Sequence, residues 1–170
     1  MYELILLFFR IAIFKNGPQD VPASSMVLRL ILPLYVAVNY LVLMLNGSTS
    51  TALLQIGADL AMMLAFVWPL LYFAGKPARF QQTFAAMVGT DAIISFVAIP
   101  AIASLGSQAG PLAYFAMLAL MVWHWAVSGH ILRNALDRSW FFGLGLALLY
   151  IMLSSQVMMA LFSDPAISPE

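Results

Sequence analysis

Five long apolar stretches, separated by short polar turns, dominate this chain. They cover approximately residues 24–45, 52–74, 82–105, 111–132 and 139–162. A helix needs about 20 residues to cross a hydrocarbon core about 30 Å thick, so each stretch is long enough. Only 8% of the residues are charged, whereas a soluble domain has about 25%. The pattern predicts an all-α polytopic membrane protein: one membrane domain over residues 1–170, with five transmembrane helices in a lipid bilayer.

The first 14 residues, MYELILLFFRIAIF, are apolar but too short to cross the membrane. Glu3 and Arg10 are seven positions apart and therefore share one helix face. This pattern is typical of an amphipathic helix that lies in the membrane interface with its polar edge toward water. The following KNGPQDVP segment, residues 15–22, predicts the end of that helix.

The basic residues are all predicted on one side of the membrane, because they occur only near the N-terminal end of the chain and in alternate connections between the apolar stretches. All seven lie before or early in the first stretch, in the second connection or in the fourth: Arg10, Lys15, Arg29, Lys76, Arg79, Arg133 and Arg138. Lys and Arg accumulate on the cytoplasmic side of membrane proteins. The distribution therefore predicts a cytoplasmic N-terminus and an outside C-terminus, as in a bacterial inner-membrane protein.

Two ionisable residues are predicted near the middle of the membrane. At a helical rise of about 1.5 Å per residue, Asp91 lies roughly 14 Å from one side and His124 roughly 18 Å from the other. A short connection makes their helices antiparallel neighbours, so the two side chains can meet. Such a pair can serve as a proton relay or substrate site. The alternative is a polar staple that fixes the packing of two helices, and the sequence leaves both interpretations open.

A second set of polar residues is expected nearer the outer surface: Asn39, Gln55, Asp59 and Gln156. Gln55 and Asp59 are four apart and share a helix face. With Ser154 and Ser155, the set predicts either a wet cavity that opens outward or separate polar side chains that each reach water.

Composition excludes several classes of function. There is no cysteine, and net charge is zero, so neither thiol chemistry nor nucleic-acid binding is expected. His124 and His130 are six residues apart, about 120° around a helix, and cannot both ligate one haem iron. We therefore predict no enzyme activity, no catalytic residue, no cofactor and no metal.

The basic turn and third stretch, KPARFQQTFAAMVGTDAIISFVAIP, have Gly89 early and Pro100 late, and two long apolar stretches follow. This arrangement resembles the Yip family, the Ypt/Rab-interacting five-pass membrane proteins, and their bacterial relatives. The resemblance implies a non-enzymatic protein of membrane organisation or assembly, which binds another membrane protein or a second copy through helix faces. The family's Asp-Leu-x-Gly-Pro motif is matched only by Asp59-Leu60, so a small-GTPase partner is not implied. The alternative is a small proton-coupled transporter or permease that uses Asp91 and His124.

Overall fold

The computed structural model describes residues 2–47, 50–106 and 110–162, and these residues contain helices and turns but no strand. The elements are α1 (Tyr2–Ala12), η1 (Pro18–Asp20), α2 (Ser25–Leu45), α3 (Ala52–Phe73), η2 (Pro77–Arg79), α4 (Phe80–Gly106), α5 (Pro111–Leu136) and α6 (Trp140–Phe162). The two η elements are single 3₁₀ turns. Helices α2 to α6 are long and apolar enough to span a membrane. The predicted all-α fold with five spans and a short N-terminal helix is therefore confirmed.

Local side-chain chemistry sets the start of two spans. The Ser24 hydroxyl accepts a hydrogen bond of 3.2 Å from the Met26 amide and so caps the start of α2. Pro111 occupies the first position of α5, where its missing N–H costs no intrahelical hydrogen bond.

Helix α5 ends later than predicted, at Leu136 instead of residue 132. The charged segment that begins at Arg133 continues the helix to Leu136, and the side-chain amide of Asn134 donates to the His130 carbonyl one turn earlier at 2.8 Å. Asp137 then ends the helix in the left-handed conformation, with φ of 53°. The connection between α5 and α6 is therefore shorter than the sequence suggests.

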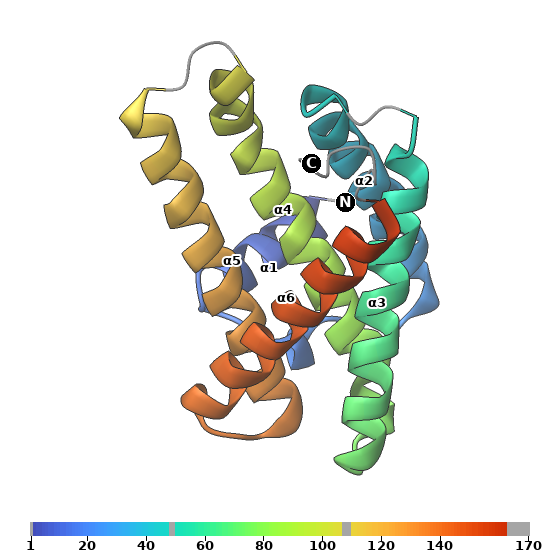
Figure 1. The fold of residues 1–170 in the computed structure, drawn as a ribbon. Helices are drawn as coiled ribbons and strands as arrows, with labels where there is room; N and C mark the ends of the chain where they lie inside the picture. Colours follow the sequence, from blue (N-terminus) through green and yellow to red (C-terminus); the bar gives the residue numbers. More distant parts are fainter. Residues whose placement is uncertain (1, 48–49, 107–109, 163–170) are drawn as a thin grey trace.

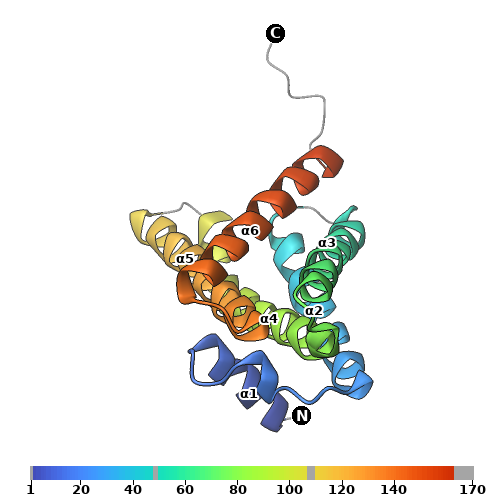
Figure 2. The same ribbon diagram turned by 90° about the horizontal axis from the view of Figure 1, so that it is seen from below.

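Helix α4 occupies the centre of the bundle and packs against α2, α5 and α1. Figure 1 shows α5 running beside it and α6 crossing in front of it at an angle, and Figure 2 shows α1 on one side of α4 and α6 on the other. The central position explains why the run from Thr83 to Thr90 on α4 is buried at every residue.

The N-terminal helix α1 is docked on the bundle. Glu3 and Arg10 are exposed, as its amphipathic pattern predicts, while Phe8 is buried against the bundle. A Cβ atom at Gly89 of α4 would lie 2.5 Å from side-chain carbons of both Phe8 and Ile31. Helices α1 and α2 therefore pack closely on α4 at Gly89, and a larger residue at this position would push them away.

The two ends of the bundle differ in charge. We call the end formed by the α3–α4 turn and the α5–α6 turn the basic end. At the opposite end, the described residues between α2 and α3 and between α4 and α5 carry no charged side chain, and we call it the uncharged end. At the basic end, Lys76 Nζ and Arg79 Nη1 lie 2.6 and 2.9 Å from one carboxylate oxygen of Asp137. Hydrogen bonds from Arg79 and then from Lys76 lower the pKa of Asp137 to about 2.

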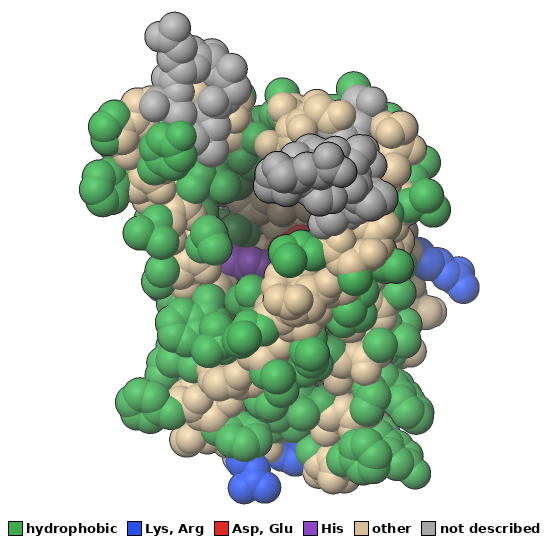
Figure 3. Space-filling model, viewed as in Figure 1, with side chains coloured by type: hydrophobic (Ala, Val, Ile, Leu, Met, Phe, Trp, Pro, Cys, Tyr) green, Lys and Arg blue, Asp and Glu red, His purple; other side chains and the backbone are tan. Residues whose placement is uncertain are grey.

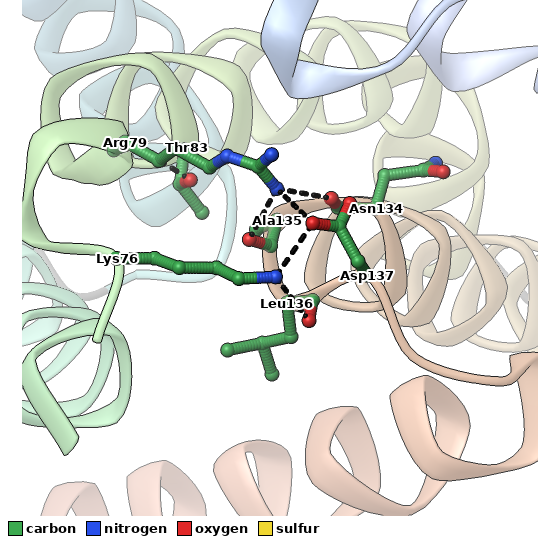
Figure 4. Close-up of polar contacts among 7 residues, drawn as sticks. All are labelled: Lys76, Arg79, Thr83, Asn134, Ala135, Leu136 and Asp137. Carbon is green, nitrogen blue, oxygen red and sulfur yellow. Dashed lines mark hydrogen bonds and ion pairs between the residues drawn. The ribbon is translucent and has the colours of Figure 1, made fainter. Parts of the chain in front are cut away.

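The same two cations also bond to the backbone at the end of α5. Figure 4 shows Lys76 donating to the Leu136 carbonyl at 2.7 Å and Arg79 donating to the Ala135 carbonyl at 3.0 Å. Carbonyls in the last turn of a helix lack intrahelical partners, so these bonds satisfy them. The α3–α4 turn is thereby fastened to the α5–α6 turn.

Helices α5 and α6 touch closely near the basic end and separate toward the uncharged end (Figure 1). A Cβ atom at Gly143 would lie 2.3 Å from the carbonyl oxygen of Gly129, so the two backbones are in direct contact there. Trp125 on α5 also connects the two helices near this contact, because its Nε1 donates a hydrogen bond of 2.9 Å to the Leu144 carbonyl on α6. Beyond this crossing the helices diverge and leave space between them.

Candidate functional site

A cavity of about 240 Å³ lies where α5 and α6 diverge, with α3 and α4 forming its other walls. In Figure 3 this face of the molecule is hollowed, and histidine and acidic surface is visible in the hollow. The lining residues are Asp59, Met63, Met87, Asp91, His124, Ser128, Tyr150, Ile151, Ser154, Ser155 and Met158.

The lining residues recur at a spacing of four along each helix. Residues four apart lie on the same helix face, so each helix presents one stripe to the cavity. The stripes pair Asp59 with Met63, Met87 with Asp91, His124 with Ser128, and Tyr150 with Ser154. Ionisable and hydroxyl groups from four helices thus converge on one space between otherwise apolar helices.

Asp91 and His124 are brought together, as their matched depths suggested. His124 Nε2 lies 3.2 Å from Asp91 Oδ1, and the side chains are 35% and 16% exposed. The contact follows from the packing of α4 against α5. An imidazole and a carboxylate at this distance can share a proton, and both groups face the cavity.

Asp59 belongs to the same site, although the sequence grouped it with residues nearer the surface. One of its carboxylate oxygens accepts a hydrogen bond from the Tyr35 hydroxyl, and the other lies 3.5 Å from the Ser154 hydroxyl. Asp59 and Asp91 line one cavity and act on each other electrostatically. Two carboxylates and one imidazole therefore share this space.

Asn39 lies next to the site, outside the cavity wall, and forms hydrogen bonds around it. Its amide donates to the Tyr35 carbonyl at 3.1 Å, and its oxygen accepts from the Ser95 hydroxyl at 3.2 Å. Its side chain also neighbours Asp91. Asn39 thus links Asp91 to the Tyr35–Asp59 hydrogen bond without lining the cavity itself.

Gln55 and Gln156 do not join the site, which corrects the expectation of a cluster with Asn39 and Asp59. Gln55 bends back one turn and donates to the Thr51 hydroxyl at 2.9 Å. Gln156 is exposed, because it follows Ser154 by two residues and so lies about 200° around α6 from the cavity wall. The predicted cluster splits, with Asn39 and Asp59 in the site and both glutamines outside.

Two tyrosines in the site went unrecognised in the sequence. Tyr35 and Tyr150 are buried, and Tyr150 lines the cavity while Tyr35 holds Asp59. Each stands four residues before a polar residue of the site, Asn39 or Ser154. A tyrosine four positions from a polar side chain on an apolar helix is the signal that would have found them.

His130 lies outside the cavity, on the part of α5 that is packed on all sides. Its ring is buried, and its Nε2 lies 2.9 Å from the Asn16 carbonyl. It packs against Phe14 and Trp140 at centroid distances of 5.4 and 5.9 Å. His130 therefore fastens the segment after α1 to the end of α5.

The chemistry available in the cavity is that of carboxylates, an imidazole and hydroxyl groups. None of the described lining residues is Lys or Arg. Within the part of the chain that the structure describes, no group of three His, Asp or Glu residues is placed to hold a metal ion. The arrangement is suited to holding and passing protons, and to binding a ligand through its positive charge or its hydrogen-bond donors. The chain matches no family model, no curated protein and no solved structure.

Proposed function

We propose that this protein is a small proton-coupled permease of the bacterial inner membrane, with its N-terminus in the cytoplasm and its C-terminus outside. The observation that carries the proposal is that the Asp91–His124 pair lies on the wall of a cavity that it shares with Asp59. Ionisable residues within membrane helices are costly, and those that face a cavity mark substrate and proton pathways. A polar staple needs no cavity beside it.

The positions of the basic residues support the proposed orientation. Lys76, Arg79 and Arg138 lie at the basic end, which the positive-inside rule assigns to the cytoplasm. The cavity then opens toward the outside. Transport requires that it open to the cytoplasm in turn. The Gly129–Gly143 crossing and the bridges to Asp137 are the contacts that have to separate in that step.

Thiol accessibility tests the proposal directly, because the chain contains no cysteine. Ser154→Cys places a thiol on the outer part of the cavity wall, and Ser128→Cys places one nearer the basic end. A membrane-impermeant thiol reagent is applied to right-side-out and to inside-out vesicles over a range of pH. We expect Ser154→Cys to react from outside and Ser128→Cys to react from the cytoplasmic side in at least one condition.

The matched control is Leu153→Cys, because Leu153 is exposed on the outer surface of α6 and does not line the cavity. A charged reagent should not modify a thiol that faces lipid. Asp91→Asn should alter how the Ser128→Cys reaction depends on pH. If Ser128→Cys never reacts from the cytoplasmic side while Ser154→Cys reacts from outside, the site does not alternate and the permease proposal fails.

We keep a second candidate, an assembly subunit of the kind implied by the Yip resemblance. It is supported by an apolar groove of about 470 Å³ between α1, α2 and α4, lined by Phe9, Phe96 and Val97 among others. A transmembrane helix of another protein or a second copy can pack into such a groove. Phe96→Ala should then reduce the yield of a specific membrane partner in mild detergent, while Leu153→Ala should not. Equal yields from both variants would remove this candidate.

A further inference from the structure

We infer that the cavity takes a small organic monocation of the alkylammonium class and exchanges it for a proton. This inference rests on the proposed permease function and names its substrate class. Three properties of the cavity carry it: its charge, its size and the composition of its walls.

The charge of the cavity favours a cation. Its described ionisable lining residues are Asp59, Asp91 and His124, and none is Lys or Arg. With a neutral imidazole, two ionised carboxylates lie within an apolar bundle, and such charges are stable only when a positive charge or a proton compensates them. An anionic solute would add to the electrostatic repulsion between the two carboxylates, and a neutral solute would not reduce this repulsion. A proton or a cation is the occupant that lowers the energy.

The size of the cavity favours a ligand of few atoms. A volume of about 240 Å³ is below the range of about 300–1,000 Å³ typical of drug-sized ligand pockets. It corresponds to roughly eight water molecules at about 30 Å³ each. A short alkylammonium ion fits this space, whereas a quaternary ion with several long chains does not.

The walls favour an organic cation over a metal ion. A dehydrated metal ion needs several ligands at once, and no group of three His, Asp or Glu residues among the described ones is placed to provide them. Beside the carboxylates lie the apolar side chains of Met63, Met87, Ile151 and Met158. The ammonium group can therefore meet a carboxylate while its alkyl chain contacts methionine and isoleucine.

The exchange keeps the charge of the site constant. When the alkylammonium ion enters, the proton shared by Asp91 and His124 leaves to water, and no bond in the ligand is made or broken. The groups that face Asp91 in this step are His124 on α5, Asp59 on α3, Tyr150 on α6, and Tyr35 and Asn39 on α2. One cation replaces one proton, which is the stoichiometry of an antiporter.

Proton release on ligand binding tests the inference. Purified wild-type protein in weakly buffered detergent solution at neutral pH is titrated with butylammonium chloride, and an indicator dye reports released protons. We expect saturable release approaching one proton for each bound cation. Four controls should give no saturable release. Butyrate tests the sign of the charge, butanol tests the need for a charge, sodium chloride tests ionic strength, and tetrabutylammonium tests size.

Variants distinguish the loss of this binding site from a general loss of folding. Asp91→Asn should abolish proton release, and butylammonium affinity should fall about tenfold or more, because a buried charge partner is lost. Asp91→Glu should restore both, and Gln156→Leu, outside the cavity on α6, should behave as wild type. The inference is overturned if radiolabelled butylammonium does not bind folded wild-type protein saturably, or if butanol and butyrate give the same release.

The outcome is independent of the thiol accessibility test. Cation binding with proton release, but no cytoplasmic reactivity of Ser128→Cys, would leave a cation-binding site and end the permease proposal. Cytoplasmic reactivity without butylammonium binding would end the present inference and leave a permease for another solute.

Discussion

The basic end and the uncharged end of the bundle are built from the same helices, but the basic end is closely packed and the uncharged end is open around a cavity. At the basic end, all residues from Val127 to Leu132 of α5 are buried, and Lys76 and Arg79 bridge to Asp137. Toward the uncharged end, α5 and α6 separate around a cavity that contains Asp59, Asp91 and His124. Gly129 and Gly143 let the two backbones touch near the basic end, whereas the same two helices enclose a cavity toward the uncharged end.

This contrast shows where the stability of the fold resides. Close packing, helix-end hydrogen bonds and the docked segment after α1 are concentrated toward the basic end. The cavity places ionisable groups where they are costly, which is common at functional sites that the rest of the structure supports. Disturbing the basic end should therefore change folding, and disturbing the cavity should mainly change chemistry.

The largest effect expected is the opposite behaviour of a topology reporter at the two ends. A reporter that is active only in the cytoplasm should work when fused after Lys76 or Arg138 and fail after Gly47 or Gly110. Basic residues at one end of the bundle are the reason for the expected orientation. Activity at both sets of positions, or reversal of the pattern, would overturn the proposed orientation of the cavity.

The next largest effect is expected at the α5–α6 crossing. Gly143→Val puts a side chain against the Gly129 carbonyl, where even a Cβ atom would lie 2.3 Å away. Overpacking typically costs about 1–3 kcal/mol, and we expect the upper part of this range because the obstructing atom is backbone. Unfolding in mixed detergent micelles measures the loss.

The matched control for this variant is Gly145→Ala on the same helix. A Cβ atom at Gly145 has no atom of another residue within 4 Å beyond its chain neighbours and its own helix backbone. Alanine is also a better helix former than glycine by up to about 1 kcal/mol. Gly145→Ala should therefore retain full stability, and an equal loss in both variants would show that the crossing is not the point of close contact.

The fold was predictable because its main signals are local. Apolar runs long enough to span a membrane gave five helices, and helical rise placed Asp91 and His124 at matching depth. The docking of α1 could not be predicted, because it depends on the shape of the surface around Gly89. Likewise, the rotations of α3 and α6 decide that Asp59 and Ser154 face one cavity while Gln156 does not.

A smaller effect is expected for the coupling between Asp91 and His124. A double-mutant cycle with Asp91→Ala and His124→Ala measures this coupling. The stability losses of the two single variants should add up to more than the loss of the double variant, because each single change leaves a polar partner unpaired. Couplings of this kind average about 0.6 kcal/mol in membrane proteins, so we expect a value of that order. Zero coupling would mean that the 3.2 Å contact does not contribute to stability.

The roles of the pair are separated by Asp91→Asn, which keeps a side chain able to form hydrogen bonds but removes the titrating carboxylate. We expect a stable fold that has lost proton release. A variant that folds and retains proton release would favour the polar staple, since packing requires a hydrogen bond and not a charge.

The smallest effect is expected from protonation of Asp137 at the basic end. Its pKa is lowered from 3.8 to about 2, so ionised Asp137 stabilises the folded state above pH 4 or so, and this contribution is lost as pH falls toward 2. The carboxylate is exposed, which makes the contribution small and sensitive to salt. Asp137→Asn should remove this part of the acid dependence, while Asp20→Asn should leave it in place.

Water access to the cavity is the most direct test of the central claim, that the uncharged half of the bundle holds a wet, ionisable site. Hydroxyl-radical footprinting with mass spectrometry reports side chains that contact water, and methionine is oxidised readily. Met63, Met87 and Met158 line the cavity, whereas Met121 and Met152 are exposed on the outer, lipid-facing surface. Met63 and Met87 are each only 3% exposed, so Met158, which is half-buried, is the informative residue of the cavity wall. In lipid nanodiscs we expect Met158 to be oxidised faster than Met121 and Met152, and butylammonium to slow its oxidation. If Met158 is oxidised no faster than Met121 and Met152, the cavity is dry and the proposed site does not exist.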